Sequence, residues 1–229
     1  MKLIIILALL ALSACLPSKT DPQLQTTETT DAAKGISLNS TVNQKFLISA
    51  NGIGQAKLGM TLGKLKQISE PDTEFELISS FLADVDAIAV SKSGLVQYYI
   101  LYPAGSTSHP DRHTPTDEDP ITILVTDNQN YQTSEGVGVG TPIKQAEGVY
   151  GNAILAYNVD GESREYVTFS DRNPSNIRFR ASYFKLISDG LGFSGIYADY
   201  PGVSSTTNKY KEDAAISAIE VSCQEDCLK

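Results

Sequence analysis

A glycine-containing stretch that leads into a short apolar helix occurs twice in this chain, and it constrains the fold more than any other feature. Gly59-Met60-Thr61 precedes one apolar stripe at helical spacing, and Gly140-Thr141-Pro142 precedes another, with the second glycine 81 residues after the first. Threonine is a favoured N-cap residue, and proline is tolerated in the first turn of a helix. We therefore predict that Thr61 and Thr141 cap two helices, with Pro142 at the first helical position, and that the folded region consists of two tandem repeats.

Segments rich in β-branched and aromatic residues follow each predicted helix, and several of them alternate between apolar and polar residues. The predicted helices carry the stripes Leu62, Leu65, Ile68 and Ile143, Ala146, Val149, and the second ends at Tyr150-Gly151. The predicted strands are Phe75–Ile78, Ala87–Val90, Leu95–Tyr102, Ile121–Thr126, Ala153–Tyr157, Tyr166–Phe169, Ile177–Ala181, Tyr183–Ile187, Phe193–Tyr197 and Ala215–Val221. Short helices followed by runs of strands predict an α+β fold that is predominantly β, with antiparallel sheets.

The Gly-Met-Thr-Leu entry at Gly59 and the Gly-Val-Gly-Val-Gly-Thr-Pro entry that ends at Pro142 resemble the repeat of beta-lactamase-inhibitory-protein-like domains. The first entry is also similar to that of the outer-membrane assembly lipoproteins of the BamE family. The organisation resembles a group of envelope-stress-regulated bacterial lipoproteins of unknown function. The resemblance spans roughly residues 46 to 222 and implies a short helical segment paired with an antiparallel sheet, twice in tandem. No position of this chain matches the binding residues of the inhibitor.

The first fifteen residues are typical of a secretory signal, because Lys2 leads into an apolar run that ends at Ser13-Ala14-Cys15. The run is shorter than the roughly 20 apolar residues that span a bilayer. Small residues directly before Cys15 resemble the bacterial lipobox. That resemblance implies cleavage after residue 14, with diacylglycerol on the Cys15 thiol and an acyl chain, such as palmitate, on its amine. The alternative is an ordinary cleavable signal. Leu16 after the cysteine favours the outer membrane, facing the periplasm.

The predicted organisation has four parts. Residues 1–14 form the signal peptide, and residues 15–45 form the lipidated cysteine and a polar, disordered tether. A tether of this length has a reach on the order of 30 Å. Residues 46–126 and 127–229 form the first and second α+β repeats.

Two cysteines remain once Cys15 carries lipid. Cys223 and Cys227 lie in an oxidising compartment under this hypothesis, where a nearby pair is expected to form a disulfide. A turn through the three intervening residues must bring their Cα atoms within about 7 Å. The alternatives are free or intermolecular thiols, and redox or metal chemistry.

The charge balance argues against nucleic acid as a partner, because 27 acidic residues outnumber 18 basic ones. The two histidines, His109 and His113, lie with Asp111 in a polar loop, which makes these three residues the candidate metal ligands. The alternative is a solvated connecting loop. No nucleophile motif accompanies the histidines, so we predict that the chain is not an enzyme and needs no cofactor.

Arg164, Arg172, Arg178 and Arg180 are close in sequence within an otherwise acidic chain. They are candidates for binding an anion, although surface arginines paired with nearby carboxylates are the alternative. Alternation in Ile177–Ala181 predicts that Arg178 and Arg180 face outward. The leading hypothesis is a non-enzymatic binding lipoprotein that contacts or inhibits an envelope protein and touches the membrane through its lipid alone. The alternative is a metal- or small-anion-binding protein that uses the His109–Asp119 loop or the Arg164–Arg180 cluster.

Overall fold

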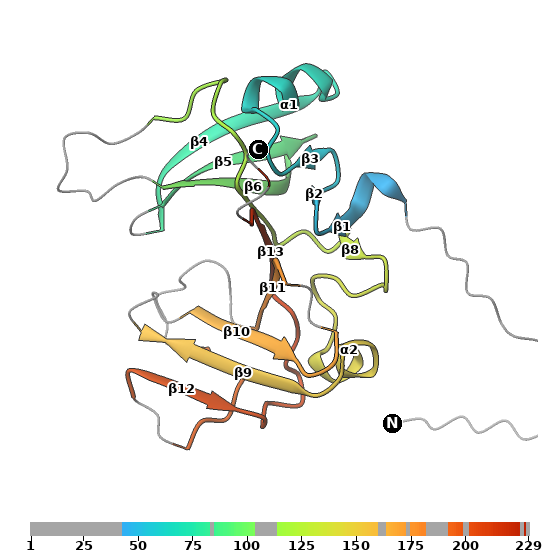
Figure 1. Cartoon of the computed structure of the whole chain (residues 1–229), viewed down its shortest axis with the longest axis vertical. Helices are drawn as coiled ribbons and strands as arrows, with labels where there is room; N and C mark the ends of the chain where they lie inside the picture. Colours follow the sequence, from blue (N-terminus) through green and yellow to red (C-terminus); the bar gives the residue numbers. More distant parts are fainter. Residues whose placement is uncertain are drawn as a thin grey trace, which may run out of the picture. The chain divides into compact units, whose positions relative to one another are not determined.

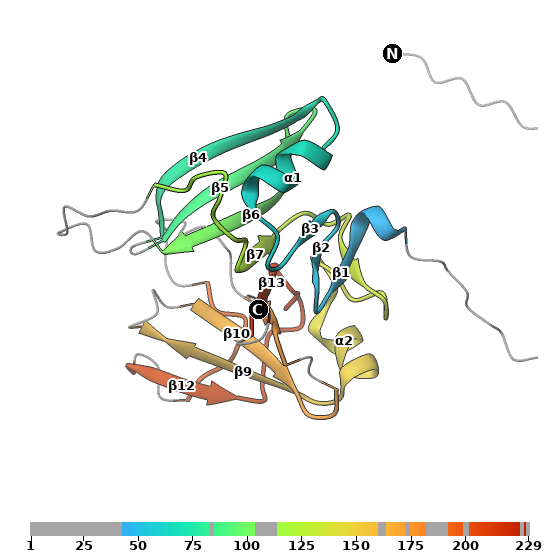
Figure 2. The ribbon, with the colours of Figure 1, turned by 45° about the horizontal axis from the view of Figure 1, so that its top comes forward.

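The apolar, alternating segments pair into one large antiparallel sheet, as expected for strands that each bury one face. In this computed structural model, residues 40–229 form one compact unit, and the described residues are 43–82, 85–103, 114–159, 164–172, 175–181, 192–198, 202–224 and 227. Within these residues the nine-stranded sheet has the order β12-β9-β10-β11-β13-β7-β6-β5-β4 (Figures 1 and 2). Its strands are β4 (Thr73–Leu82), β5 (Val85–Lys92), β6 (Leu95–Pro103), β7 (Ile123–Thr126), β9 (Ala153–Asn158), β10 (Arg164–Phe169), β11 (Ile177–Arg180), β12 (Ser204–Thr207) and β13 (Ala218–Ser222).

A second, four-stranded sheet has the order β3-β2-β1-β8 and follows a single 3-10 turn. Its β1 and β8 pair in parallel, so the start of the folded region is joined to the middle of the chain. The elements are η1 (Gln44–Phe46), β1 (Leu47–Ser49), β2 (Gly52–Ile53), β3 (Ala56–Lys57) and β8 (Gln132–Thr133). The predominantly β, α+β fold class is thereby confirmed.

The two helices, α1 (Leu62–Ile68) and α2 (Ile143–Tyr150), begin in the same way. At each entry the chain exchanges backbone hydrogen bonds, at 2.7 to 3.0 Å, with the segment that precedes a strand of the large sheet: β7 for α1 and β13 for α2. These bonds are Gly59 N to Ile121 O, Ile121 N to Met60 O and Leu62 N to Asp119 O at α1, and Gly140 N to Ile216 O, Ile216 N to Thr141 O and Ile143 N to Ala214 O at α2.

The predicted helix caps are confirmed in two cases and wrong in one. Thr61 caps α1 by accepting a hydrogen bond from Lys64 N at 3.2 Å, and Gly151 ends α2 with φ +90°. Thr141 is not the cap of α2, because the helix starts at Ile143 and Pro142 occupies the N-cap position with extended backbone. A backbone bridge from Pro142 to Ala215 accompanies this conformation. The Thr141 hydroxyl instead accepts a hydrogen bond from Gly138 N at 2.9 Å.

The main hydrophobic core lies between one face of the large sheet and the helices with the small sheet. Leu62 and Leu65 of α1 and Ile143 and Ala146 of α2 are buried in it. The predicted helical stripe is wrong at Ile68, whose side chain is exposed. A smaller hydrophobic cluster lies on the opposite face of the sheet, on β5, β6, β7 and β13. It consists of Ala87, Ala89, Tyr99, Leu101, Val125 and Ala218.

Most predicted strands are present; one is not a strand, one lies outside the described residues, and one strand of the large sheet was not predicted. Phe193–Tyr197 is not a strand, because its regular pairing is limited to a bridge between Gly195 and Tyr210. The predicted strand Tyr183–Ile187 lies outside the described residues. The hydroxyl-rich β12, which pairs with β9, has no apolar alternation and is not among the predicted strands.

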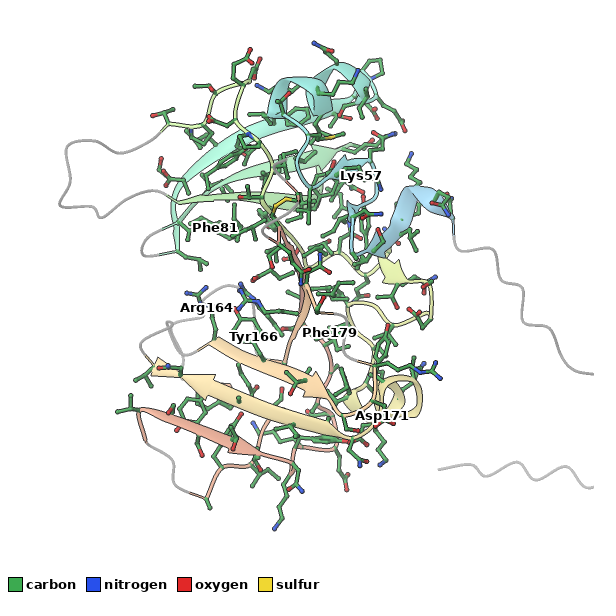
Figure 3. The ribbon with its side chains drawn as sticks, in the orientation of Figure 1. Lys57, Phe81, Arg164, Tyr166, Asp171 and Phe179 are labelled. Atoms are coloured by element: carbon green, nitrogen blue, oxygen red, sulfur yellow. A yellow bond between two sulfur atoms is a disulfide. The ribbon has the colours of Figure 1, made fainter. Side chains whose placement is uncertain are left out.

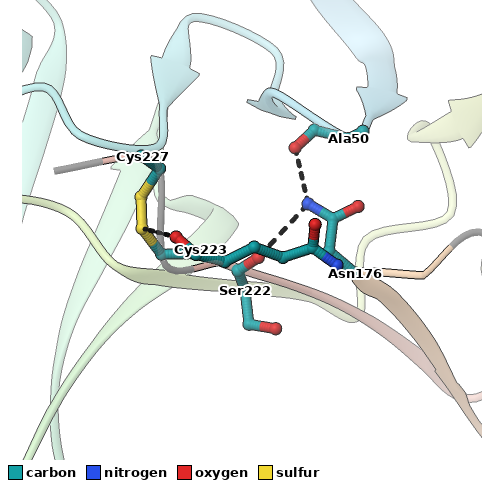
Figure 4. The surroundings of a disulfide bond; sticks show 6 residues. Ala50, Asn176, Ser222, Cys223 and Cys227 are labelled. Carbon is teal, nitrogen blue, oxygen red and sulfur yellow. Dashed lines mark hydrogen bonds between the residues drawn. A yellow bond between two sulfur atoms is a disulfide. The ribbon is translucent and has the colours of Figure 1, made fainter. Parts of the chain in front are cut away.

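Cys227 lies beside Gly59 at the entry to α1. Cys223 and Cys227 lie at disulfide distance, with their Cα atoms 5.7 Å apart (Figure 4). Cys227 N donates to Gln224 O in the turn that the prediction requires. The amide of Asn176 bridges Ala50 O and Ser222 O just before this turn. Neither helix among the described residues is long and apolar enough to cross a membrane.

Candidate functional site

Two of the four predicted arginines come together on the face of the large sheet that carries the smaller hydrophobic cluster. Antiparallel pairing sets Arg178 opposite Glu220 and Arg180 opposite Ala218, so both guanidinium groups reach the Glu220 carboxylate from neighbouring positions. Arg164 lies on the same face, two positions along β10 from Tyr166 (Figure 3). Arg172 lies beyond the other end of β10 and is exposed, so it is not part of this cluster.

Glu220 is buried between the two arginines. Its side chain is 3% exposed, and its Oε2 accepts a hydrogen bond from Arg180 Nη2 at 2.8 Å. Its Oε1 accepts two hydrogen bonds from Arg178, one from Nε at 2.9 Å and one from Nη2. Charge-assisted bonds of this kind are the stronger class of protein hydrogen bond. The carboxylate therefore holds both guanidinium groups in fixed positions.

The electrostatics agree with an ionised cluster. Burial acts to raise the pKa of Glu220, but the positive charges of Arg180 and Arg178 outweigh burial and hold that pKa below its usual range. Burial acts to lower the pKa of Arg178, and the nearby Glu220 charge outweighs it in turn. Two positive charges and one negative charge leave the cluster with a formal charge of +1.

The prediction that Arg180 faces outward is wrong, because its side chain is 2% exposed. Arg178 fits the prediction, with a side chain that is 54% exposed. Alternation places both arginines on one face of β11 correctly, but the partner Glu220 permits the burial of one of them.

The ring of Tyr166 lies against both guanidinium groups. Its centroid is 4.9 Å from Arg178 Cζ and 5.4 Å from Arg180 Cζ, within the range of cation–π attraction. Tyr166 is half-buried and supplies an aromatic wall next to the exposed part of Arg178. This stacking restricts the orientation of the Arg178 guanidinium, in addition to the hydrogen bonds with Glu220.

A groove of about 330 Å³ opens beside Arg178 and Tyr166 on this face. Both charged residues among its described lining residues, Arg164 and Arg178, are arginines. Asn158 adds an amide and Ala156 a small apolar side chain. The charged side chains among the described lining residues are thus cationic, in a chain whose formal net charge is -9.

A larger pocket, of about 670 Å³, lies between residues 192–194, the segment 211–217 and the entry to α2. Its charged lining residues are of both signs: Asp127, Lys211 and Asp213. The Ser194 hydroxyl donates to Ala181 O at 2.6 Å, and the Ser217 hydroxyl donates to Arg180 O at 3.2 Å. Both hydroxyls thus hold backbone in place, and the mixed charges do not select an anion or a cation.

Glu165 forms a second buried carboxylate site, on the opposite face of β10. Its oxygens accept hydrogen bonds from Ser194 N and Gly195 N, both at 2.8 Å, and from Tyr197 Oη at 2.7 Å. Burial, followed by the Glu165 hydrogen bond and charge, raises the pKa of Tyr197. The predicted strand Phe193–Tyr197 therefore adopts a loop conformation that wraps a carboxylate.

The predicted metal ligands His109, Asp111 and His113 lie outside the described residues. The described part of the chain contains no group of three or more His, Cys, Asp or Glu side chains arranged to hold a metal ion.

Sequence reasoning missed Glu220 and Tyr166. A charged residue within the apolar segment Ala218-Ile219-Glu220-Val221 is a signal for Glu220, because a buried carboxylate requires a cationic partner and Arg178-Phe179-Arg180 offers two. Tyr166 carries no comparable signal, because its role depends on the register between β10 and β11.

No protein-family model matches the chain, and no curated protein matches it. Among solved structures, the chain is similar to that of the uncharacterized protein yfeY from Escherichia coli, with 13% sequence identity and a TM-score of 0.45. The alignment covers 77% of this chain and 99% of that one.

Proposed function

We propose that this chain is a lipid-anchored, non-enzymatic binding protein of the bacterial cell envelope, which contacts an envelope protein through the groove beside Arg178. The Ser13-Ala14-Cys15 lipobox supports the anchor and, with Leu16, an outer-membrane location facing the periplasm. The polar segment 15–45 supports a tether that lets the folded unit reach a partner.

The arginine cluster is the observation that carries the binding role. Burying Glu220 and Arg180 costs desolvation energy, and a buried ion pair often stabilises a fold no more than apolar residues of similar size. The same cluster fixes the exposed guanidinium of Arg178 next to an aromatic wall. Preorganised groups of this kind lower the entropy lost on binding. A binding role accounts for this arrangement better than stability alone.

We further infer that the folded unit is a tandem duplication, in line with its resemblance to beta-lactamase-inhibitory-protein-like repeats. The matching hydrogen bonds at the two helix entries support this inference, because they make Ile121 and Ile216 equivalent. Four residues after each of these lie Val125 and Glu220, which pair with each other where β7 meets β13. Such self-pairing of equivalent positions is what an approximate twofold axis between two repeats would produce.

The proposal is tested by crosslinking the full-length, tagged chain in native cell envelopes and identifying captured proteins by mass spectrometry, with Cys15→Ala as the control. We expect one dominant envelope protein with the wild-type chain, and a Cys15→Ala chain that no longer fractionates with membranes. Capture of abundant neighbours alone would contradict the binding role. A Cys15→Ala chain that still sediments with membranes would contradict the anchor.

A further inference from the structure

We propose that the groove between Arg178, Arg164 and Tyr166 binds a carboxylate, and that its natural source is an acidic side chain on the partner protein. This inference rests on the proposed binding function and specifies the chemistry of the partner. It follows from how Arg178 is oriented, which groups line the groove and what kind of anion they fit.

Arg178 has one edge of its guanidinium occupied and one edge available. Nε and Nη2 both donate to Glu220 Oε1, so the edge that these two nitrogens share faces the protein. Among the described residues, none accepts a hydrogen bond from Nη1 of Arg178. The side chain is 54% exposed and lines the groove, so the edge formed by Nη1 and Nη2 is available to a ligand.

The position of Arg178 is set before any ligand arrives. The buried carboxylate of Glu220 fixes one edge of the guanidinium, and the centroid of the Tyr166 ring lies 4.9 Å from Arg178 Cζ. An arginine on a free surface must lose rotamer freedom when it pairs, which is why most surface ion pairs contribute little. Arg178 has already lost that freedom on folding, so its pairing with a ligand carries a smaller entropy cost.

The available edge of Arg178 selects an anion, because its N–H groups are cationic donors. Arg164 and Arg178 are both cationic, and Glu220 is engaged with two arginines on the protein side of Arg178. The surrounding chain is acidic overall, with a formal net charge of -9. Long-range attraction of a highly anionic surface is therefore weak, and recognition depends on a single anionic group that enters the groove.

The available edge matches a carboxylate better than a phosphate. Two parallel N–H groups in one plane fit the two oxygens of a carboxylate in a bidentate pair. A phosphate group offers three oxygens and up to two charges, and protein sites for it commonly supply backbone N–H groups or a helix N-terminus, which this sheet face does not present among its described lining residues. Ala156 and the Tyr166 ring suit the aliphatic stem of a glutamate side chain. A volume of about 330 Å³ admits one or two side chains.

The test is a nuclear magnetic resonance titration of the full chain in non-ionic detergent, observed at the arginine Nε–H signals. The probe is an acetylated, amidated Ala-Glu-Ala peptide, and the Ala-Gln-Ala peptide and inorganic phosphate are the comparison ligands. We expect saturable shifts of the Arg178 signal with the glutamate peptide in the millimolar range, and at least about tenfold weaker effects with the glutamine peptide and with phosphate.

Variants separate the groove from general charge. Arg178→Lys keeps the charge but removes the planar edge, and we expect it to weaken binding of the glutamate peptide at least about tenfold. Arg172→Gln removes an exposed arginine outside the groove and should leave binding unchanged. A cooperative thermal unfolding transition shows that each variant is folded. If Arg178→Lys does not fold, Arg164→Gln serves as the second groove variant.

The outcomes distinguish this inference from the function on which it rests. Equal binding of the glutamate and glutamine peptides, tighter binding of phosphate, or unchanged binding in the groove variant would overturn the carboxylate site. If the envelope crosslinking captures a partner and Arg178→Lys does not weaken that capture, the site is overturned while the binding function stands. If the glutamate peptide binds as expected and no envelope protein is captured, the carboxylate site stands while the protein partner is overturned.

Discussion

Substitution of Glu220 by glutamine removes the negative charge from a buried ion pair without changing the shape of the side chain. Glu220 and Arg180 have side chains that are 3% and 2% exposed, and the carboxylate balances the charge of Arg180 in the interior. Glutamine keeps the shape and one acceptor oxygen, but it removes the negative charge that Arg180 contacts in the interior. Removing one partner of a buried ion pair typically costs about 3–5 kcal/mol.

The retained amide oxygen places the expected loss at the lower end, about 3 kcal/mol of unfolding free energy. For a folded unit of this size, each kcal/mol lowers Tm by about 2–4 °C, so the expected decrease is about 6–12 °C. Urea unfolding followed by circular dichroism gives the free energy, and calorimetry gives Tm. A loss below about 1 kcal/mol would refute the account of Glu220 as the counter-ion of a buried arginine.

A double variant provides the control. Replacing both Arg180 and Glu220 by methionine removes the buried charges together, and such replacements are often neutral or stabilising. We therefore expect Arg180→Met/Glu220→Met to recover most of the stability that Glu220→Gln loses. A double variant that is less stable than the single one would show that these residues stabilise the fold by packing and not by charge.

The stability difference between wild type and Glu220→Gln should depend on pH. The folded-state pKa of Glu220 lies below its unfolded value, so the ionised carboxylate stabilises the fold above the unfolded pKa of about 4.3, and this contribution is lost as the pH falls through the folded-state pKa. Glu220→Gln lacks this titration. The stability difference between wild type and variant should therefore narrow below about pH 4, and a difference that widens there would contradict the assignment.

Three further changes test other parts of the fold. Gly59→Ala should cost more than about 2 kcal/mol of unfolding free energy, because Gly59 has φ +81° and a Cβ would lie 2.4 Å from Cys227 O. Gly136 has the same φ but open space around it, so Gly136→Ala should cost about 1 kcal/mol. Equal losses in urea unfolding would exclude the clash at Gly59. Tyr197→Phe should cost about 1.5–3 kcal/mol by removing a hydrogen bond to the buried Glu165 carboxylate, with faster amide exchange confined to residues 192–198. Reduction of the C-terminal disulfide, which closes a short loop, should cost about 2 kcal/mol, and unchanged Tm after reduction would contradict its stabilising role.

The sequence predicted the fold class and the positions of most strands, since these follow from local patterns. The segment Leu95–Tyr102 is rich in β-branched and aromatic residues and forms the core strand β6. Gly59 and Gly140 both adopt positive φ, at +81° and +86°, where glycine is strongly favoured. Cys223 and Cys227 also approach to disulfide distance, through the turn that their predicted pairing requires.

The errors share a physical cause, because each depends on contacts between distant parts of the chain. Alternation assigned Arg180 to a face of β11 but could not reveal that Glu220, 40 residues later, buries it there. Thr141 has the right side chain for a cap, but the backbone bridge of Pro142 with Ala215 accompanies a helix start one residue later. The sequence predicted the arginines of the site, but not the carboxylate of Glu220 and the ring of Tyr166 that orient them.

Site-specific photocrosslinking tests whether the groove beside Arg178 contacts an envelope protein. A photoreactive residue is introduced at Asn158, which lines the groove, or at Lys144, an exposed position on α2, and the full chain is irradiated in native cell envelopes. We predict one dominant adduct with an envelope protein from position 158, its loss when Arg178→Lys is added, and no matching adduct from position 144. The same adduct from both positions, or an adduct at 158 that persists with Arg178→Lys, would contradict binding of the partner through this groove.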